Sequence, residues 1–167
     1  MDAKIRQETL FKVVCEGFAT AAFAVVDSPE EEPATTLKDS GEILCARLEF
    51  TGPFCGVMAI AAPREFAKIV GTNMLCLEDD VADIFFDRYD PLKELLNMVC
   101  GSLLPALAGP KHEFAIGAPE EVAFMEYVKM TEDKNDSRTL IDLHIESFPV
   151  ELLMLANPES IEMVLEA

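Results

Sequence analysis

The chain has 167 residues, half of them hydrophobic, and a formal net charge of −18 that comes from 31 acidic and 13 basic side chains. A chain of this size and apolar content can bury a core, and we expect a single domain over residues 1–167. The negative charge argues against nucleic acid and anionic membrane surfaces as partners, because both are polyanions.

The first 75 residues contain two helical patterns and one strand pattern. Residues 4–26 carry apolar side chains at near-helical spacing and predict an amphipathic helix, which an acidic, proline-containing loop follows. From Leu44 to Thr51 apolar and polar residues alternate, and a "TGP" turn then leads into the apolar run "FCGVMAIAA". This combination predicts a β-hairpin. A second helix is expected over residues 63–75, with Pro63 at its first position.

The rest of the chain adds one strongly apolar helix and a second predicted hairpin. Residues 76–89 form an acidic connector, and the sequence from 90 to 104 predicts a third helix. Residues 121–131 and 138–148 predict the two strands of another hairpin, and a short helix is predicted over residues 157–167. Hairpins separated by helices predict an α/β or α+β sandwich, in which helices cover a mainly antiparallel sheet.

Cysteines and histidines form no metal or disulfide pattern. The five cysteines are an odd number without a C-x-x-C pair, which favours buried free thiols in a reducing cytoplasm. His112 and His144 lie outside any metal-ligand spacing, so we assign neither to a metal site. The N-terminal sequence lacks the features of a secretory signal, and Asn97 and Pro105 interrupt the uncharged segment at 95–110, which therefore predicts a core helix and not a membrane span.

The helix at 90–104 has two distinct sides on a helical wheel. Its apolar side comprises Leu92, Leu95, Leu96, Val99, Cys100 and Leu103. Glu94, Asn97 and Gly101 fall on the opposite side at neighbouring positions. A glycine inside a helix costs about 1 kcal/mol relative to alanine, and Gly101 adds nothing to the core, so it suits the close approach of another molecule. A solvated face with an incidental glycine explains the wheel equally well.

The start of this helix and its polar side suggest specific chemistry. Asp90, followed by Pro91, predicts an N-cap whose carboxylate accepts a hydrogen bond from an early backbone N–H. The amide of Asn97 can hold a water molecule through one donor and one acceptor, and the carboxylate of Glu94 can bind a cation on a partner. No base partner lies nearby in the sequence, which argues against a covalent nucleophile.

The spacing Asp90-x-x-x-Glu94-x-x-Asn97 resembles the D/S-x-x-x-E-x-x-N signature of the CheC/CheX/FliY-type phosphatases of bacterial chemotaxis. The continuation "NMVCG" and the preceding segments "FTGPFCGVMAIAAP" and "FAKIVGTNML" are also similar to that family. The resemblance covers residues 40–107. One signature is present where CheC-like chains tend to carry two, so the chain is most similar to the CheX branch.

The resemblance implies hydrolysis of the aspartyl phosphate on a CheY-like response regulator. Asn97 would position the attacking water, Glu94 would pair with a lysine of the regulator, and Asp90, Met98 and Gly101 would contact that partner. The regulator, and not this chain, would hold the Mg²⁺ ion, and the chain would form a homodimer in the cytoplasm. Phosphoryl transfer depends chiefly on positioning and electrostatic stabilisation, which a rigid helix can supply. The alternative is a non-enzymatic module that binds a receiver domain without dephosphorylating it.

Overall fold

Helices separate consecutive pairs of strands along the chain in the computed structural model, which describes residues 3–22, 36–75, 89–132 and 138–156. In chain order the described elements are α1 (Ala3–Ala22), the 3-10 helix η1 (Leu37–Asp39), β1 (Ile43–Thr51), β2 (Gly56–Pro63), α2 (Arg64–Leu75), α4 (Asp90–Ala108), β3 (Ala115–Ile116), β4 (Glu120–Val122), α5 (Phe124–Glu132), β5 (Arg138–Ile145) and β6 (Phe148–Ala156).

The strands form one antiparallel sheet in the order β3-β1-β2-β6-β5. β4 also pairs with β1: β3 pairs with the end of β1 at Phe50 and Thr51, and β4 pairs with residues 45–47. The β1–β2 hairpin is in the predicted position, with Cys45 opposite Ala61. β2 then pairs with β6, and β6 pairs with β5. The predicted mainly antiparallel sheet is therefore confirmed.

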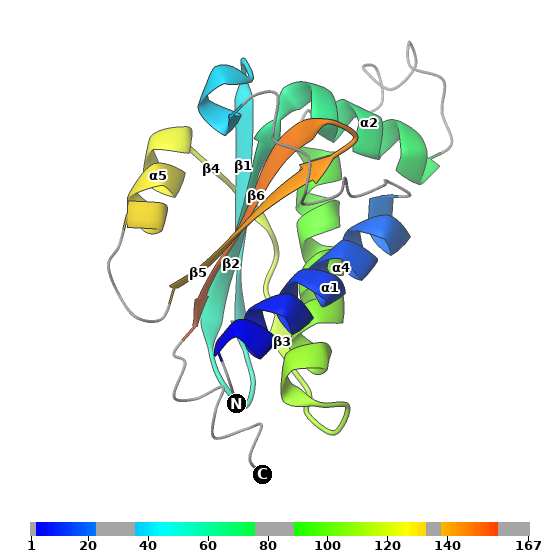
Figure 1. The fold of residues 1–167 in the computed structure, drawn as a ribbon, viewed down its shortest axis with the longest axis vertical. Helices are drawn as coiled ribbons and strands as arrows, with labels where there is room; N and C mark the ends of the chain where they lie inside the picture. Colours follow the sequence, from blue (N-terminus) through cyan, green and yellow to red (C-terminus); the bar gives the residue numbers. More distant parts are fainter. Residues whose placement is uncertain (1–2, 23–35, 76–88, 133–137, 157–167) are drawn as a thin grey trace.

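Helices cover both faces of the sheet, as Figure 1 shows: α1, α2 and α4 lie on one face, and α5 lies on the other. Alternation along β1 explains the two cores, because side chains of a strand point alternately to opposite faces. Leu44, Ala46 and Leu48 are buried in the larger core with α1, α2 and α4. Cys45 belongs to a smaller core on the other face, which also contains Tyr127 of α5. The structure is the predicted α+β sandwich.

Two predicted boundaries move slightly. Pro63 still pairs with Ile43 and closes β2, so α2 begins at Arg64 and not at the proline. A proline at the end of a strand is tolerated because its missing N–H is not needed there. The helix expected over residues 4–26 is confirmed as far as Ala22, and residues 23–26 lie outside the described part of the chain.

The second hairpin was predicted with the wrong partner. Residues 124–132 form helix α5, and β5 pairs instead with β6 through a turn in which Glu146 and Ser147 have positive φ angles of 52° and 67°. Tyr127, with Phe124 three residues before it, packs on the sheet from one side of α5. β6 was missed because it is buried on both faces, which removes the alternation of apolar and polar residues.

Two further predictions, the acidic connector up to residue 88 and the helix at 157–167, lie outside the described residues. Within the described segments, no helix is both long and apolar enough to cross a membrane.

Candidate active site on helix α4

Helix α4 is embedded in the larger core of the fold. It packs against α1, α2, β1 and β2, and its buried side is formed by Pro91, Leu92, Leu95, Leu96, Val99, Cys100, Leu103, Leu104 and Ala108. Pro105 lies on the exposed side and does not end the helix, which continues to Ala108, four residues beyond the predicted end. Because core contacts hold this helix along its length, side chains on its free side project from a firm support.

The free side of α4 carries the residues that the helical wheel placed there. Glu94 and Gly101 are exposed, and Asn97 is half-buried between them. Met98 is 38% exposed, a high value for a large apolar side chain. We call Glu94, Asn97, Met98 and Gly101 the α4 ridge. The structure thus places these four predicted residues on one side of the helix, and the fifth, Asp90, is exposed in the first turn, four residues before Glu94.

The two polar side chains of the ridge are free to interact with another molecule. Neither the carboxylate of Glu94 nor the side-chain amide of Asn97 has a hydrogen bond or ion pair within the described chain. An amide without an internal partner can bind water with both its donor and its acceptor, and an exposed carboxylate can pair with an incoming cation.

Gly101 keeps the ridge open. A Cβ atom placed there would find a single neighbour within 4 Å, Cδ1 of Ile116 at 3.9 Å. The next residue, Ser102, is exposed, and its hydroxyl donates a hydrogen bond to the carbonyl oxygen of Met98 at 3.1 Å. The methyl group of an alanine at position 101 would therefore fit within the free chain. A requirement for glycine at this position would come from a bound partner.

Asp90 differs from its prediction. Tyr89 occupies the N-cap position, no side chain caps the helix, and Asp90 is already within the first turn. The backbone of Tyr89 has φ −91° and ψ −21°, so helical geometry starts one residue early and leaves Asp90 inside the helix. Its carboxylate lies 3.1 Å from Nζ of Lys93. A negative charge at this position also interacts favourably with the positive N-terminal end of the helix dipole.

Sequence reasoning missed Lys93. Its ammonium group contacts Asp90 and also lies 3.8 Å from Oε1 of Glu121 on β4. The spacing of three residues between Asp90 and Lys93 indicates a possible pair on a helix. Nothing local in the sequence indicates the contact with Glu121.

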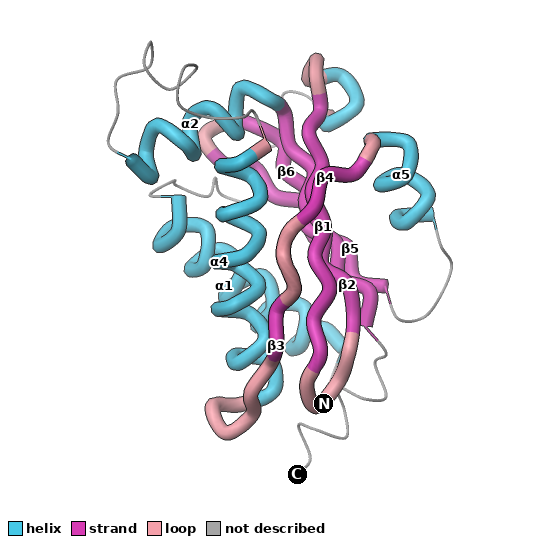
Figure 2. Tube along the Cα trace, turned by 180° about the vertical axis from the view of Figure 1, so that it is seen from behind, coloured by secondary structure: helices cyan, strands magenta, loops and turns pink. Residues whose placement is uncertain are grey.

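The sheet edge borders the α4 ridge. Figure 2 shows β3 running beside α4, between the helix and β1, before the chain crosses to α5 through β4. Gly117 joins β3 to β4 and donates a backbone hydrogen bond to the carbonyl oxygen of Glu49 at 2.8 Å. A Cβ atom at this position would lie 3.0 Å from that oxygen, which is closer than an ordinary contact and favours glycine.

The neighbouring cysteine on α4 cannot serve as a nucleophile at neutral pH. Cys100 is buried, and burial raises the pKa of its thiol to about 12. The described cysteines are all free thiols, and Cys45 is buried as expected. Cys55 is exposed in the β1–β2 turn, contrary to the expectation of uniformly buried thiols. Its place in the turn leaves it without covering elements.

Other polar features of the described residues lie elsewhere. A cleft of about 370 Å³ between β4 and α5 is lined in part by Arg47, Glu120 and Lys129, and it includes neither Glu94 nor Asn97. In the part of the chain that the structure describes, no group of three or more His, Cys, Asp or Glu side chains could hold a metal ion.

The fold and the site together define an α+β sandwich that presents its candidate residues on the exposed side of a core helix. Residues 44–144 match a protein-family model described as chemotaxis phosphatase CheX. This match spans more than half of the chain, and the chain therefore belongs to the chemotaxis phosphatase CheX family. The resemblance noted in the sequence is confirmed.

Solved structures show the same fold. The CheX chain from Desulfovibrio desulfuricans has 17% identity and a TM-score of 0.60, with 90% of this chain and 97% of that chain covered. The CheX–CheY–BeF3–Mg²⁺ complex from Borrelia burgdorferi has 13% identity and a TM-score of 0.56, with 90% and 96% covered. Thermotoga maritima FliY has 13% identity and a TM-score of 0.55, with 94% and 88% covered. Curated protein sequences gave no significant match.

Proposed function

We propose that this chain hydrolyses the aspartyl phosphate of a CheY-like response regulator. In this mechanism Asn97 positions the attacking water, and Glu94 pairs with a lysine of the regulator. The carrying observation is that both side chains are accessible on one side of a core helix and have no hydrogen bond or ion pair with any described residue. Membership of the chemotaxis phosphatase family supports the reaction class.

The geometry supports separate roles for the residues of the α4 ridge. Asn97 can hold a water molecule between its carbonyl oxygen and its amide group, and thereby orient a lone pair toward phosphorus. Glu94 lies one turn away and can fix the regulator through a charge-assisted hydrogen bond. Met98 and Gly101 extend the ridge as an apolar, low surface that a partner can approach closely.

The metal belongs to the partner in this proposal. A Mg²⁺ ion held by the regulator would neutralise phosphoryl oxygens while this chain supplies only the positioned water and the docking contact. The Borrelia burgdorferi neighbour, whose complex contains CheY, BeF3 and Mg²⁺, supports a CheY-like partner for this fold. We also expect a homodimer, which analytical ultracentrifugation can measure.

The test is phosphate release from a phosphorylated CheY-like regulator with Mg²⁺, with and without the purified chain. Wild type should accelerate release above the regulator's own rate. Asn97→Ala should lower kcat by about 100-fold, because misplacing a reacting group by even about 1 Å can cost that much. Asn97→Asp should also be slow, since it loses the amide donor and adds charge next to a phosphoryl group.

The Glu94→Ala variant separates docking from chemistry. Losing one charge-assisted contact should raise KM for the regulator by about tenfold, equivalent to about 1.4 kcal/mol, with little change in kcat. Glu126→Ala is the matched control, because it removes an exposed carboxylate from α5 on the other face of the sheet. Binding of the phosphorylated regulator without faster release would identify a docking module and reject the phosphatase proposal.

A further inference from the structure

A three-charge link joins the first turn of α4 to the sheet edge. Nζ of Lys93 lies 3.1 Å from Oδ1 of Asp90 and 3.8 Å from Oε1 of Glu121. The side chain of Lys93 is 26% exposed, against 52% for Asp90 and 50% for Glu121. The side chain of Lys93 is thus the least exposed of the three, and its ammonium group lies between the helix and β4.

The strand at the other end of this link is itself anchored. Glu120 and Glu121 are consecutive, so their side chains point to opposite faces of the sheet. Glu120 is opposite Arg47 in the register and pairs with its guanidinium at 2.6 Å. Glu121 is opposite Ala46, whose side chain faces the core that contains α4. β4 therefore forms an ion pair with β1 through Glu120 on one face of the sheet, and an ion pair with α4 through Glu121 on the other face.

No side-chain cap holds the first turn of α4 in place. Tyr89 makes no capping hydrogen bond through its side chain, and the backbone contact there is the ordinary N–H of Lys93 to the carbonyl oxygen of Tyr89 at 2.9 Å. Lys93 directly precedes Glu94 and lies one turn before Asn97. A displacement of this turn would move both proposed site residues.

We propose that Lys93 is a positioning residue for the α4 ridge. Its ion pairs with Asp90 and Glu121 add to the core contacts of Pro91 and Leu92 and set the position of the first turn of α4 relative to β4, and so the place from which Asn97 presents water. The same contacts engage the carboxylates of Asp90 and Glu121 beside the ridge, whereas Glu94 has no ion pair among the described residues and is left for the partner's lysine. This role rests on the proposed phosphatase function.

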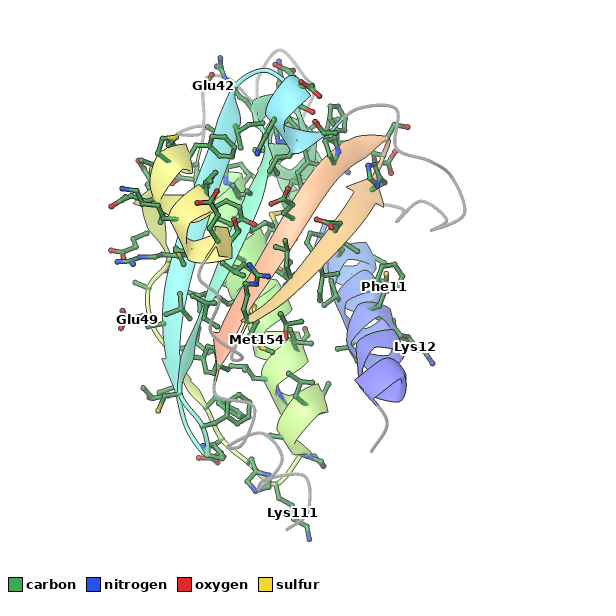
Figure 3. The ribbon with its side chains drawn as sticks, turned by 60° about the vertical axis from the view of Figure 1, so that its left-hand side comes forward. Phe11, Lys12, Glu42, Glu49, Lys111 and Met154 are labelled. Carbon is green, nitrogen blue, oxygen red and sulfur yellow. The ribbon has the colours of Figure 1, made fainter. Side chains whose placement is uncertain are left out.

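The test compares Lys93→Met with Lys93→Arg and Lys111→Met. Methionine keeps an unbranched side chain without the charge, arginine keeps the charge, and Lys111 is an exposed lysine beyond the opposite end of α4 (Figure 3). With saturating phosphorylated regulator, Lys93→Met should lower kcat about tenfold with KM within about twofold, since a small displacement suffices for such a loss. Lys93→Arg should retain kcat, and Lys111→Met should match wild type.

Two further measurements show whether the link acts as one unit. Glu121→Gln should lower kcat in the same direction, and the double variant with Lys93→Met should be no slower than Lys93→Met alone, because both changes break one interaction. Raising the salt concentration should lower the kcat of wild type toward that of Lys93→Met while leaving the kcat of the variant nearly constant.

Several outcomes would overturn the inference. An unchanged kcat in Lys93→Met, or a raised KM alone, would mean that Lys93 does not position the ridge. If wild type fails to hydrolyse, the proposed function is wrong, and hydrogen exchange over residues 90–100 then decides on the link. Faster exchange in Lys93→Met than in Lys111→Met supports it, and equal exchange refutes it.

Discussion

Glu94 on α4 and Glu151 on β6 are acidic side chains on two core elements, yet their surroundings are opposite. Glu94 is exposed and has no side-chain partner within the described residues. Glu151 is half-buried on the other face of the sheet, accepts a hydrogen bond from the Tyr127 hydroxyl at 3.2 Å, and lies opposite Asp142 in the register. Burial and the nearby Asp142 raise the pKa of Glu151.

This difference separates two uses of a carboxylate. The one with an internal partner fastens α5 to the sheet, while the one without a partner is available to another molecule. The α4 face should therefore govern hydrolysis, and the α5 face should govern stability. Substitutions on the two faces can test whether these properties are independent.

The largest expected effect is on the α5 face. Tyr127→Ala removes a fully buried aromatic side chain and should lower the free energy of unfolding by about 3–5 kcal/mol. Tyr127→Phe, the matched variant, loses only the hydrogen bond to Glu151 and should cost about 1 kcal/mol. Urea denaturation measures both. Hydrolysis per folded molecule should stay at the wild-type level, and a parallel loss of kcat in Tyr127→Phe would show that the two faces are coupled.

Gly101→Ala should change stability and activity in opposite directions. Alanine favours the helix by about 1 kcal/mol over glycine, and the free chain has room for the methyl group. Activity should fall, because the methyl group projects from the surface that the regulator must approach. Thermal denaturation and phosphate release measure the two effects. Ser102→Ala, one position further on the exposed side, is the control; undiminished activity in Gly101→Ala would show that nothing approaches the ridge there.

The smallest effect concerns Glu151 and pH. Because its folded-state pKa is raised, its contribution to stability is fully present below the unfolded pKa, near 4.5, and is lost as pH rises through the folded pKa. Glu151→Gln resembles the protonated form, so at pH 7 it should be more stable than wild type by less than about 1 kcal/mol, given solvent screening.

The advantage of Glu151→Gln should vanish at pH 4, where wild type is itself largely protonated. Unfolding curves at the two pH values measure this difference, with the exposed Glu126→Gln on α5 as the control. The same advantage at both pH values would mean that the titration of Glu151 does not contribute.

The sequence predicted those parts of the fold in which one side of an element faces solvent. The alternation after Leu44 located β1, and the polar positions of Glu94 and Asn97 gave the exposed side of α4 because polar residues on a core helix must face outward. β6 gave no such signal, since helices cover both of its faces. The segment of α5 was mistaken for a strand because its short apolar pattern fits either period.

Contacts between distant segments limited the prediction of the site. A local pattern suggested that Asp90 would cap the helix, and its actual partner is Lys93. The role of Lys93 depends on Glu121, which reaches α4 only after the chain has turned back along β1. Pairs of this kind become visible once strand register is known.

The connection from Gly117 to β4 also shows where this protein can tolerate an insertion. The chain is fixed to Glu49 at that point, and Glu120 and Glu121 follow three and four residues later. The pairing register shifts by one residue across this interval, from Phe50 opposite Ile116 to Arg47 opposite Glu120, so the connection already contains one residue that the ladder does not pair. The faces of the two glutamates are therefore set by the pairing of β4 with β1, and an insertion before Glu120 should leave those faces unchanged as long as this register is kept.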